Sequence, residues 1–123
     1  MTPTFNSYRD LEVWQRSMKL AKNIYEVTKG FPPEERFGLT NQMRRAVVSI
    51  PSNLAEGHAR FGPGECSRFI SIAMGSVAEL ETQIILSDDL GYIGKNTNLL
   101  SELDRIGRML RGLAKSIEKR RHA

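Results

Sequence analysis

Apolar residues recur at spacings of three and four in four separate segments of this chain, and no segment of useful length alternates as a strand does. Such spacing places the apolar side chains on one face of a helix. The pattern predicts helices over about residues 8–28, 34–59, 65–90 and 97–119. The first turn of the second, residues 34–38, is either the start of that helix or a separate short piece. Short connections rich in glycine, proline and asparagine favour antiparallel neighbours. The sequence therefore predicts an all-α fold, an antiparallel up-down-up-down four-helix bundle, with residues 1–123 as one domain.

Pro51 lies inside the second of these segments, where Met43, Val47, Ile50 and Leu54 continue one apolar face. A proline inside a helix removes one backbone hydrogen bond and clashes with the carbonyl four residues earlier, at a cost of about 3 kcal/mol. Short polar side chains beside it can bond the backbone groups that it leaves unpaired. Because the apolar pattern continues through the proline, we predict one helix kinked at Pro51 rather than two helices.

The cysteine, histidine and apolar content argues against several classes of protein. Cys66 is the one cysteine, so the chain forms no internal disulfide, which suits a cytoplasmic location. Two histidines and one cysteine provide no metal-ligand spacing, and we predict neither a metal nor another cofactor. The N-terminus lacks the features of a signal peptide, and no run of about 18 apolar residues predicts a membrane span. Cys66 begins an apolar stripe, which favours a packed thiol over a reactive one.

The apolar surface of the predicted helices exceeds what one small bundle needs. A helix packs on such a core with an apolar arc of about 100° or somewhat more. In the first helix, two neighbouring apolar stripes together cover roughly 200°. The third helix places Ile72, Leu86 and Leu90 away from its main stripe. Since exposed apolar patches mark interaction surfaces, we predict a homo-oligomer; the alternative is that these residues cover the ends of a tightly wrapped bundle.

Several polar residues fall close to the predicted core. Glu81 lies within the widened apolar arc of the third helix, and Asn53 lies beside the core stripe of the second. A carboxylate that loses water needs a partner, and Arg44 or Arg45 can supply one. With Glu56, these residues form a predicted polar network, buried or at a subunit interface. A catalytic pair of carboxylates is the alternative, but no nucleophile elbow or phosphate-binding loop accompanies it, so we predict no enzyme.

Positive charge concentrates in the last helix. Residues 1–104 hold 11 basic and 13 acidic side chains, a net charge of −2, whereas residues 105–123 hold 7 basic and 1 acidic, a net charge of +6. The spacing of these basic residues places them on the side of the helix away from its apolar stripe. We predict that this ridge binds nucleic acid through phosphate contacts; the alternative is a solubilising surface that complements the helix dipole. The ridge consists of Arg105, Arg108, Arg111, Lys115, Lys119, Arg120 and Arg121.

Three segments together resemble a known family. They are Asp10–Gln15 (DLEVWQ), Gln42–Gly57 (QMRRAVVSIPSNLAEG) and Gly75–Gln83 (GSVAELETQ), followed by Asp89–Tyr92 (DLGY). In this order and at these distances they closely resemble the 23S rRNA intervening-sequence proteins, often called four-helix bundle proteins. The resemblance covers residues 8–115 and implies a bacterial, cytosolic, left-handed four-helix bundle. It also implies ring-like homopentamers, a biochemical role that is not established, and no catalytic residues.

A related branch of the family resembles the accessory protein of diversity-generating retroelements. In that branch a positively charged pentamer associates with a reverse transcriptase and with nucleic acid. The leading hypothesis is therefore a non-enzymatic, oligomeric bundle that binds RNA or a ribonucleoprotein partner through its basic fourth helix. The second hypothesis is a protein-interaction scaffold with no nucleic-acid role.

Overall fold

The computed structural model describes residues 7–60, 62–94 and 97–121. Four α-helices make up most of this part of the chain, and the described residues contain no strand, which confirms the all-α fold class. A short 3-10 helix precedes each of the first two α-helices. In chain order the elements are η1 (Tyr8–Asp10), α1 (Glu12–Thr28), η2 (Pro33–Glu35), α2 (Leu39–Ala59), α3 (Pro63–Asp89) and α4 (Leu99–Arg121).

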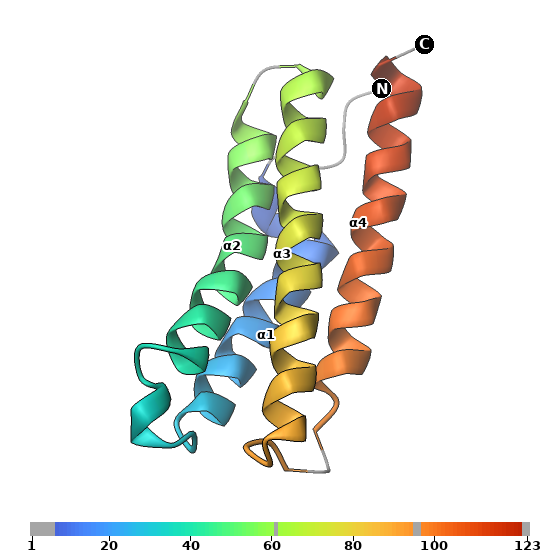
Figure 1. Cartoon of the computed structure of the whole chain (residues 1–123). Coiled ribbons are helices and arrows are strands. Elements are labelled where there is room, and N and C mark those ends of the chain that lie inside the picture. The colour runs from blue at the N-terminus through green and yellow to red at the C-terminus, as the bar shows by residue number, and fades with distance from the viewer. Residues whose placement is uncertain (1–6, 61, 95–96, 122–123) are drawn as a thin grey trace.

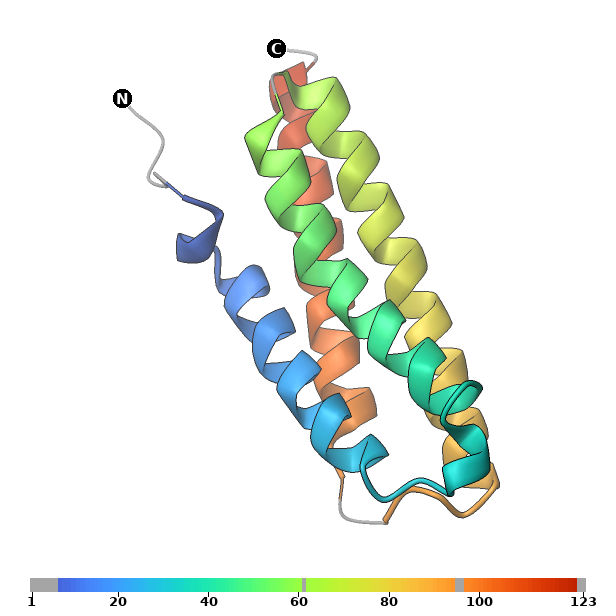
Figure 2. The ribbon, with the colours of Figure 1, turned by 90° about the vertical axis from the view of Figure 1, so that its left-hand side faces the viewer.

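The four helices pack as a bundle in which each helix has two neighbours (Figure 1). α1 and α3 each contact α2 and α4, whereas α2 and α4 share no contact within the described residues. α4 therefore lies diagonally opposite α2. In Figures 1 and 2 each helix runs back alongside the one before it, and the C-terminal end of α4 lies at the same end of the bundle as the α2–α3 connection. The handedness of the bundle stays a prediction.

The core follows the predicted apolar stripes. On α4, Leu103, Ile106 and Leu110 are almost fully buried, and they repeat at the predicted spacings of three and four. Met43, Val47 and Ile50 on α2 are also fully buried, at spacings of four and three. Because the helical period brings these side chains to one face, each helix turns its charged residues outward.

The helix boundaries differ from the prediction at all four N-terminal ends. The first predicted helix is divided at Leu11, whose ψ of 124° is extended, so η1 and α1 are separate. The second begins with the separate piece η2 before α2 starts at Leu39. α3 begins two residues earlier than predicted, at Pro63, because the fixed φ of proline suits the first position of a helix. α4 begins two residues later than predicted, at Leu99, and the carbonyl of Asn98 accepts from the backbone N–H of Glu102 at 3.0 Å.

Gly91 ends α3 in the way that the sequence indicates. Its φ of 79° is left-handed, a conformation that glycine adopts without steric cost. The backbone N–H of Tyr92 donates to the carbonyl of Ser87 at 2.9 Å, and Ile93 packs back into the core. The Tyr92 hydroxyl donates to Glu35 Oε2 at 3.0 Å, and this bond raises the pKa of Tyr92. The chain between α3 and α4 is thereby attached to the η2 end of the bundle.

Pro51 is buried within α2, and the helix continues on both sides of it. Asn53 Nδ2 donates to the carbonyl of Ser49 at 2.7 Å and to Ser49 Oγ at 2.9 Å. Ser49 Oγ in turn bonds Ser76 Oγ of α3 at 2.8 Å. Short polar side chains beside the proline therefore bond the backbone of α2 and connect it to α3. The kink itself stays a prediction.

α3 is the one described helix that is long and apolar enough to cross a membrane by length and composition. The sequence predicts no membrane span there, because glycine, serine and glutamate residues interrupt the apolar residues of α3. A core helix of a helical bundle passes the same test, and α3 packs against both α2 and α4.

Candidate nucleic-acid interface

The predicted basic ridge lies on the outer surface of α4. Arg105, Arg108, Arg111, Lys115, Lys119 and Arg120 are all exposed. Arg121 is the last residue of α4, and its side chain lies outside the described part of the chain. The helix turns this side to solvent because Ile106, Leu110 and Ile117 fill the core on the opposite side.

Acidic neighbours divide the ridge into two parts. Arg108 donates to Asp104 Oδ2 from Nε at 3.0 Å and from Nη2 at 2.5 Å. A hydrogen bond from Arg16 lowers the pKa of Glu12, and the nearby charges of Arg16 and Arg105 lower it further. The N-terminal part of the ridge therefore already lies among carboxylates. The C-terminal part has no ion pair within the described residues, and we name it the α4 basic patch: Arg111, Lys115, Lys119 and Arg120.

Polar contacts join α4 to two neighbouring helices. Arg16 of α1 lies 3.6 Å from Glu102 of α4, measured from Nη1 to Oε1. On the other side, Ser67 Oγ of α3 donates to Glu118 Oε1 at 3.4 Å. These acids lie on the flanks of α4, so the ridge between them faces away from the bundle. Sequence reasoning missed both contacts because they join residues far apart in the chain.

The residues of the predicted polar network do not come together within one subunit. Asn53 bonds Ser49, and Glu56 forms an exposed pair with Arg60, whose Nη2 lies 3.0 Å from Glu56 Oε2. Glu81 is exposed, and neither Arg44 nor Arg45 pairs with it. Glu81 lies instead beside a shallow groove between α3 and α4. Glu81 lies within the wide apolar arc of α3, but part of that arc faces solvent. The interfacial form of the network stays a prediction.

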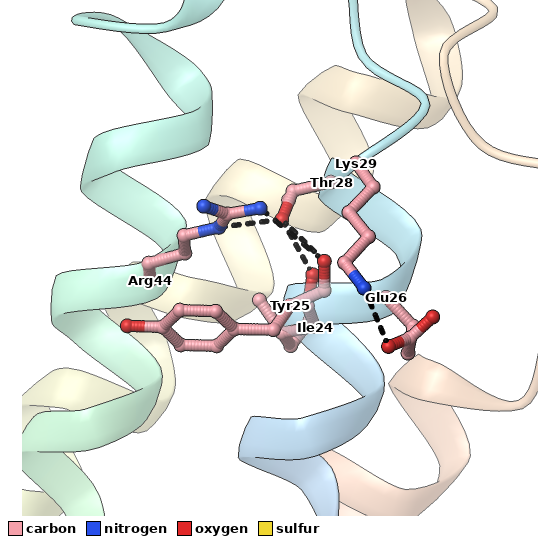
Figure 3. A network of polar contacts seen from close by, with 6 residues as sticks. All are labelled: Ile24, Tyr25, Glu26, Thr28, Lys29 and Arg44. Carbon is pink, nitrogen blue, oxygen red and sulfur yellow. Dashed lines mark hydrogen bonds and ion pairs between the residues drawn. The ribbon is translucent and has the colours of Figure 1, made fainter.

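Arg44 makes a different set of contacts from the predicted one (Figure 3). Its Nε donates to Thr28 Oγ1 at 2.9 Å, and its Nη2 donates to the carbonyl of Tyr25 at 3.3 Å. Its Cζ also lies 4.6 Å from the centroid of the Tyr25 ring. Thr28 Oγ1 itself donates to the carbonyl of Ile24 at 2.7 Å. Arg44 therefore bonds the last turn of α1, where unpaired carbonyls and the helix dipole favour a cation.

Replacing Arg44 with alanine is expected to lower the free energy of unfolding by about 1–3 kcal/mol, because the variant loses two charged hydrogen bonds and a cation–π contact. Urea unfolding followed by circular dichroism measures the change. Lys19→Ala is the control, since Lys19 is an exposed cation of α1 with no polar contact in the described structure. Its effect should stay within about 0.5 kcal/mol. Equal stabilities of the two variants would contradict the role assigned to Arg44.

The described residues offer little chemistry beyond charge. No group of three or more histidine, cysteine, aspartate or glutamate side chains among them could hold a metal ion. Burial raises the pKa of the Cys66 thiol, although the charge of Arg120 acts in the opposite direction. A thiol with a raised pKa is a poor nucleophile at neutral pH. The packed interpretation of Cys66 therefore fits its surroundings.

The model of one protein family, the 23S rRNA-intervening sequence proteins, matches residues 9–112. This chain belongs to that family. This 23S rRNA-intervening sequence protein is similar in fold to a solved structure, that of a protein of unknown function from the S23 ribosomal protein family of Bacteroides thetaiotaomicron. The two structures superpose with a TM-score of 0.75 over 84% of this chain and 98% of the other, at 20% sequence identity, which shows a shared fold. A comparison with curated proteins gives no match.

Proposed function

We propose that this 23S rRNA-intervening sequence protein is a non-enzymatic, oligomeric bundle that binds RNA through α4. The observation that carries the proposal is the α4 basic patch, where exposed cations have no acidic partner within the described residues. A phosphate backbone brought to this patch has no ion pair of these four cations to break, and its binding releases counterions. The name of the family, which refers to ribosomal RNA, supports RNA as the polyanion.

The composition of α4 defines the kind of binding that we propose. α4 contains no aromatic residue, so the ridge offers no platform for stacking on bases. Lysine and arginine side chains on a straight helix reach phosphates, which carry no sequence information. The proposed binding is therefore salt-dependent and largely insensitive to RNA sequence.

A salt titration with two single variants tests this proposal. Lys115→Gln removes a cation of the α4 basic patch, and should weaken binding of a labelled RNA and reduce the slope of log K against log salt by about 1. Asp104→Asn releases Arg108 from its carboxylate, and should strengthen binding and steepen the slope. Fluorescence anisotropy at several salt concentrations measures both. Identical affinities and slopes for the two variants and the parent chain would refute binding through α4.

A protein-interaction scaffold without a nucleic-acid role is the second candidate function. Its support is the exposed apolar surface of α3, which includes Ile72, Ile85 and Leu86. The family and the structural neighbour indicate no enzyme class. We further propose a cytoplasmic location and a homo-oligomer, a homopentamer by family resemblance, with a reverse-transcriptase-like protein as a possible partner.

A further inference from the structure

A small groove between α3 and α4 opens beside the α4 basic patch. Its volume is about 160 Å³. That is several times the share of one water molecule in the liquid, and it is smaller than the pockets that hold drug-sized ligands. The groove therefore has room for one flat ring. We name it the α3–α4 groove, and the residues of its lining that concern its chemistry are Met74, Val77, Glu81, Leu103, Asp104 and Arg111.

The floor of the α3–α4 groove is apolar. Leu103 of α4 is buried, and Met74 and Val77 of α3 are half-buried and pack against the core. Gly107, also on the lining, keeps the floor open, because a Cβ at this position would lie 3.6 Å from Val77 Cγ1 and 3.6 Å from Arg111 Nη1. A flat ring placed on this floor gains dispersion contacts with the valine methyl groups and the methionine thioether.

The charged groups on the lining of the α3–α4 groove differ in what they already bind. Asp104 accepts both hydrogen bonds of Arg108, so its carboxylate is occupied. Glu81 and Arg111 are exposed, and neither forms an ion pair within the described residues. An ionised carboxylate accepts two parallel N–H donors, one on each oxygen, and such charged hydrogen bonds are the stronger kind. Glu81 therefore has its full accepting capacity available to a ligand in the groove.

Arg111 belongs both to the α3–α4 groove and to the α4 basic patch. An RNA strand whose phosphates lie on the patch therefore brings its bases to the groove. In unpaired RNA the bases turn outward and their Watson–Crick edges are free for hydrogen bonding. The guanine edge presents two adjacent N–H donors, from N1 and from the N2 amino group, which match one carboxylate. Adenine, cytosine and uracil each place an acceptor beside the donor, and that acceptor repels a carboxylate.

We propose that the α3–α4 groove binds one unpaired guanine of the RNA whose phosphates lie on the α4 basic patch. The ring packs on Met74 and Val77, its Watson–Crick edge donates to Glu81, and Arg111 contacts a neighbouring phosphate. The inference rests on the proposed RNA binding and adds a base preference, which phosphate contacts alone do not supply. Since the base is read by a side chain of α3, the preference does not depend on an aromatic residue in α4.

Short single-stranded RNAs that differ in one base test this proposal. The reference contains only uridine, and the others carry one central guanosine, adenosine or inosine. By fluorescence anisotropy, the parent chain should bind the guanosine RNA roughly 10-fold more tightly than the reference. Inosine lacks the N2 amino group and should lose most of this gain, and adenosine should show none. Glu81→Gln should also remove the gain, because a carboxamide turns an N–H group toward one of the two guanine donors.

Glu79→Gln is the matched control, because it makes the same charge change at an exposed acid that points about 160° away from Glu81 around α3. This control should keep the preference for guanosine. Equal affinities of the parent chain for the guanosine and adenosine RNAs would overturn the guanine site and leave RNA binding through α4 intact. A preference that survives Glu81→Gln would also overturn the site. If the parent chain does not bind the uridine reference at all, the proposed function itself fails, and this inference fails with it.

Discussion

Gly57→Leu is expected to destabilise the bundle by about 3 kcal/mol or more, the largest stability effect that we expect from a single substitution. Gly57 is buried near the C-terminal end of α2, close to the connection between α2 and α3. A Cβ at this position would lie 3.0 Å from Phe69 Cβ, 3.4 Å from the Cys66 carbonyl oxygen and 3.6 Å from Cys66 Cα. None of these atoms is the end of a flexible side chain, so the two helices would have to move apart.

Moving α2 and α3 apart at this point also disturbs a contact between them. Arg60, directly after the last residue of α2, lies over the Phe69 ring of α3, with its Cζ atom 5.4 Å from the ring centroid. Urea unfolding followed by circular dichroism measures the expected loss. Gly112→Ala is the matched control, because Gly112 is exposed on α4 and a Cβ there would meet nothing within 4 Å. Alanine should raise stability by up to about 1 kcal/mol there through helix propensity alone. A Gly57→Leu chain as stable as the parent would contradict the close packing of α2 on α3.

The helices were predictable from sequence because helical periodicity is a local property. Leu103, Ile106 and Leu110 are buried where their spacing places them. The short extended break at Leu11 was not predictable, since the apolar pattern runs through it from the η1 region into α1. Gly57 shows the same limit: its sequence neighbours indicate a helix end, and the atoms that require a glycine lie on another helix.

The sequence predicted which side of α4 carries the candidate site, but it did not predict which of the cations there lie near carboxylates. Spacing alone placed Arg105 to Arg120 on the outer side of α4, since helix geometry fixes that direction. Which of these cations lie near carboxylates depends partly on neighbours along the helix, as for Arg108 and Asp104, and partly on other helices, as for Arg105, whose charge acts on Glu12 of α1. Glu81 is exposed in the single chain, because an apolar arc gives the direction of a side chain around one helix and does not reveal how much of that arc another helix covers.

Reversing three charges of the α4 basic patch is expected to weaken RNA binding about 100-fold or more at low salt, the largest binding effect that we expect. The variant combines Arg111→Glu, Lys115→Glu and Lys119→Glu. It removes three phosphate contacts and adds three carboxylates that repel the backbone. The side chains are exposed and unpaired within the described residues, so the fold should not change. Fluorescence anisotropy with a labelled single-stranded RNA measures the loss.

A matched charge reversal elsewhere separates the patch from the net charge of the molecule. Arg9→Glu, Lys19→Glu and Arg36→Glu also replace three exposed cations, and each triple variant changes the formal net charge from +4 by −6 to −2. If binding depends on a local surface, the control variant should lose affinity several-fold at most, because charges more than about 10 Å away are largely screened at 0.1 M salt. Equal losses in the two variants would mean that RNA responds only to the overall charge. Such a result would remove α4 as the binding surface even if the parent chain binds RNA.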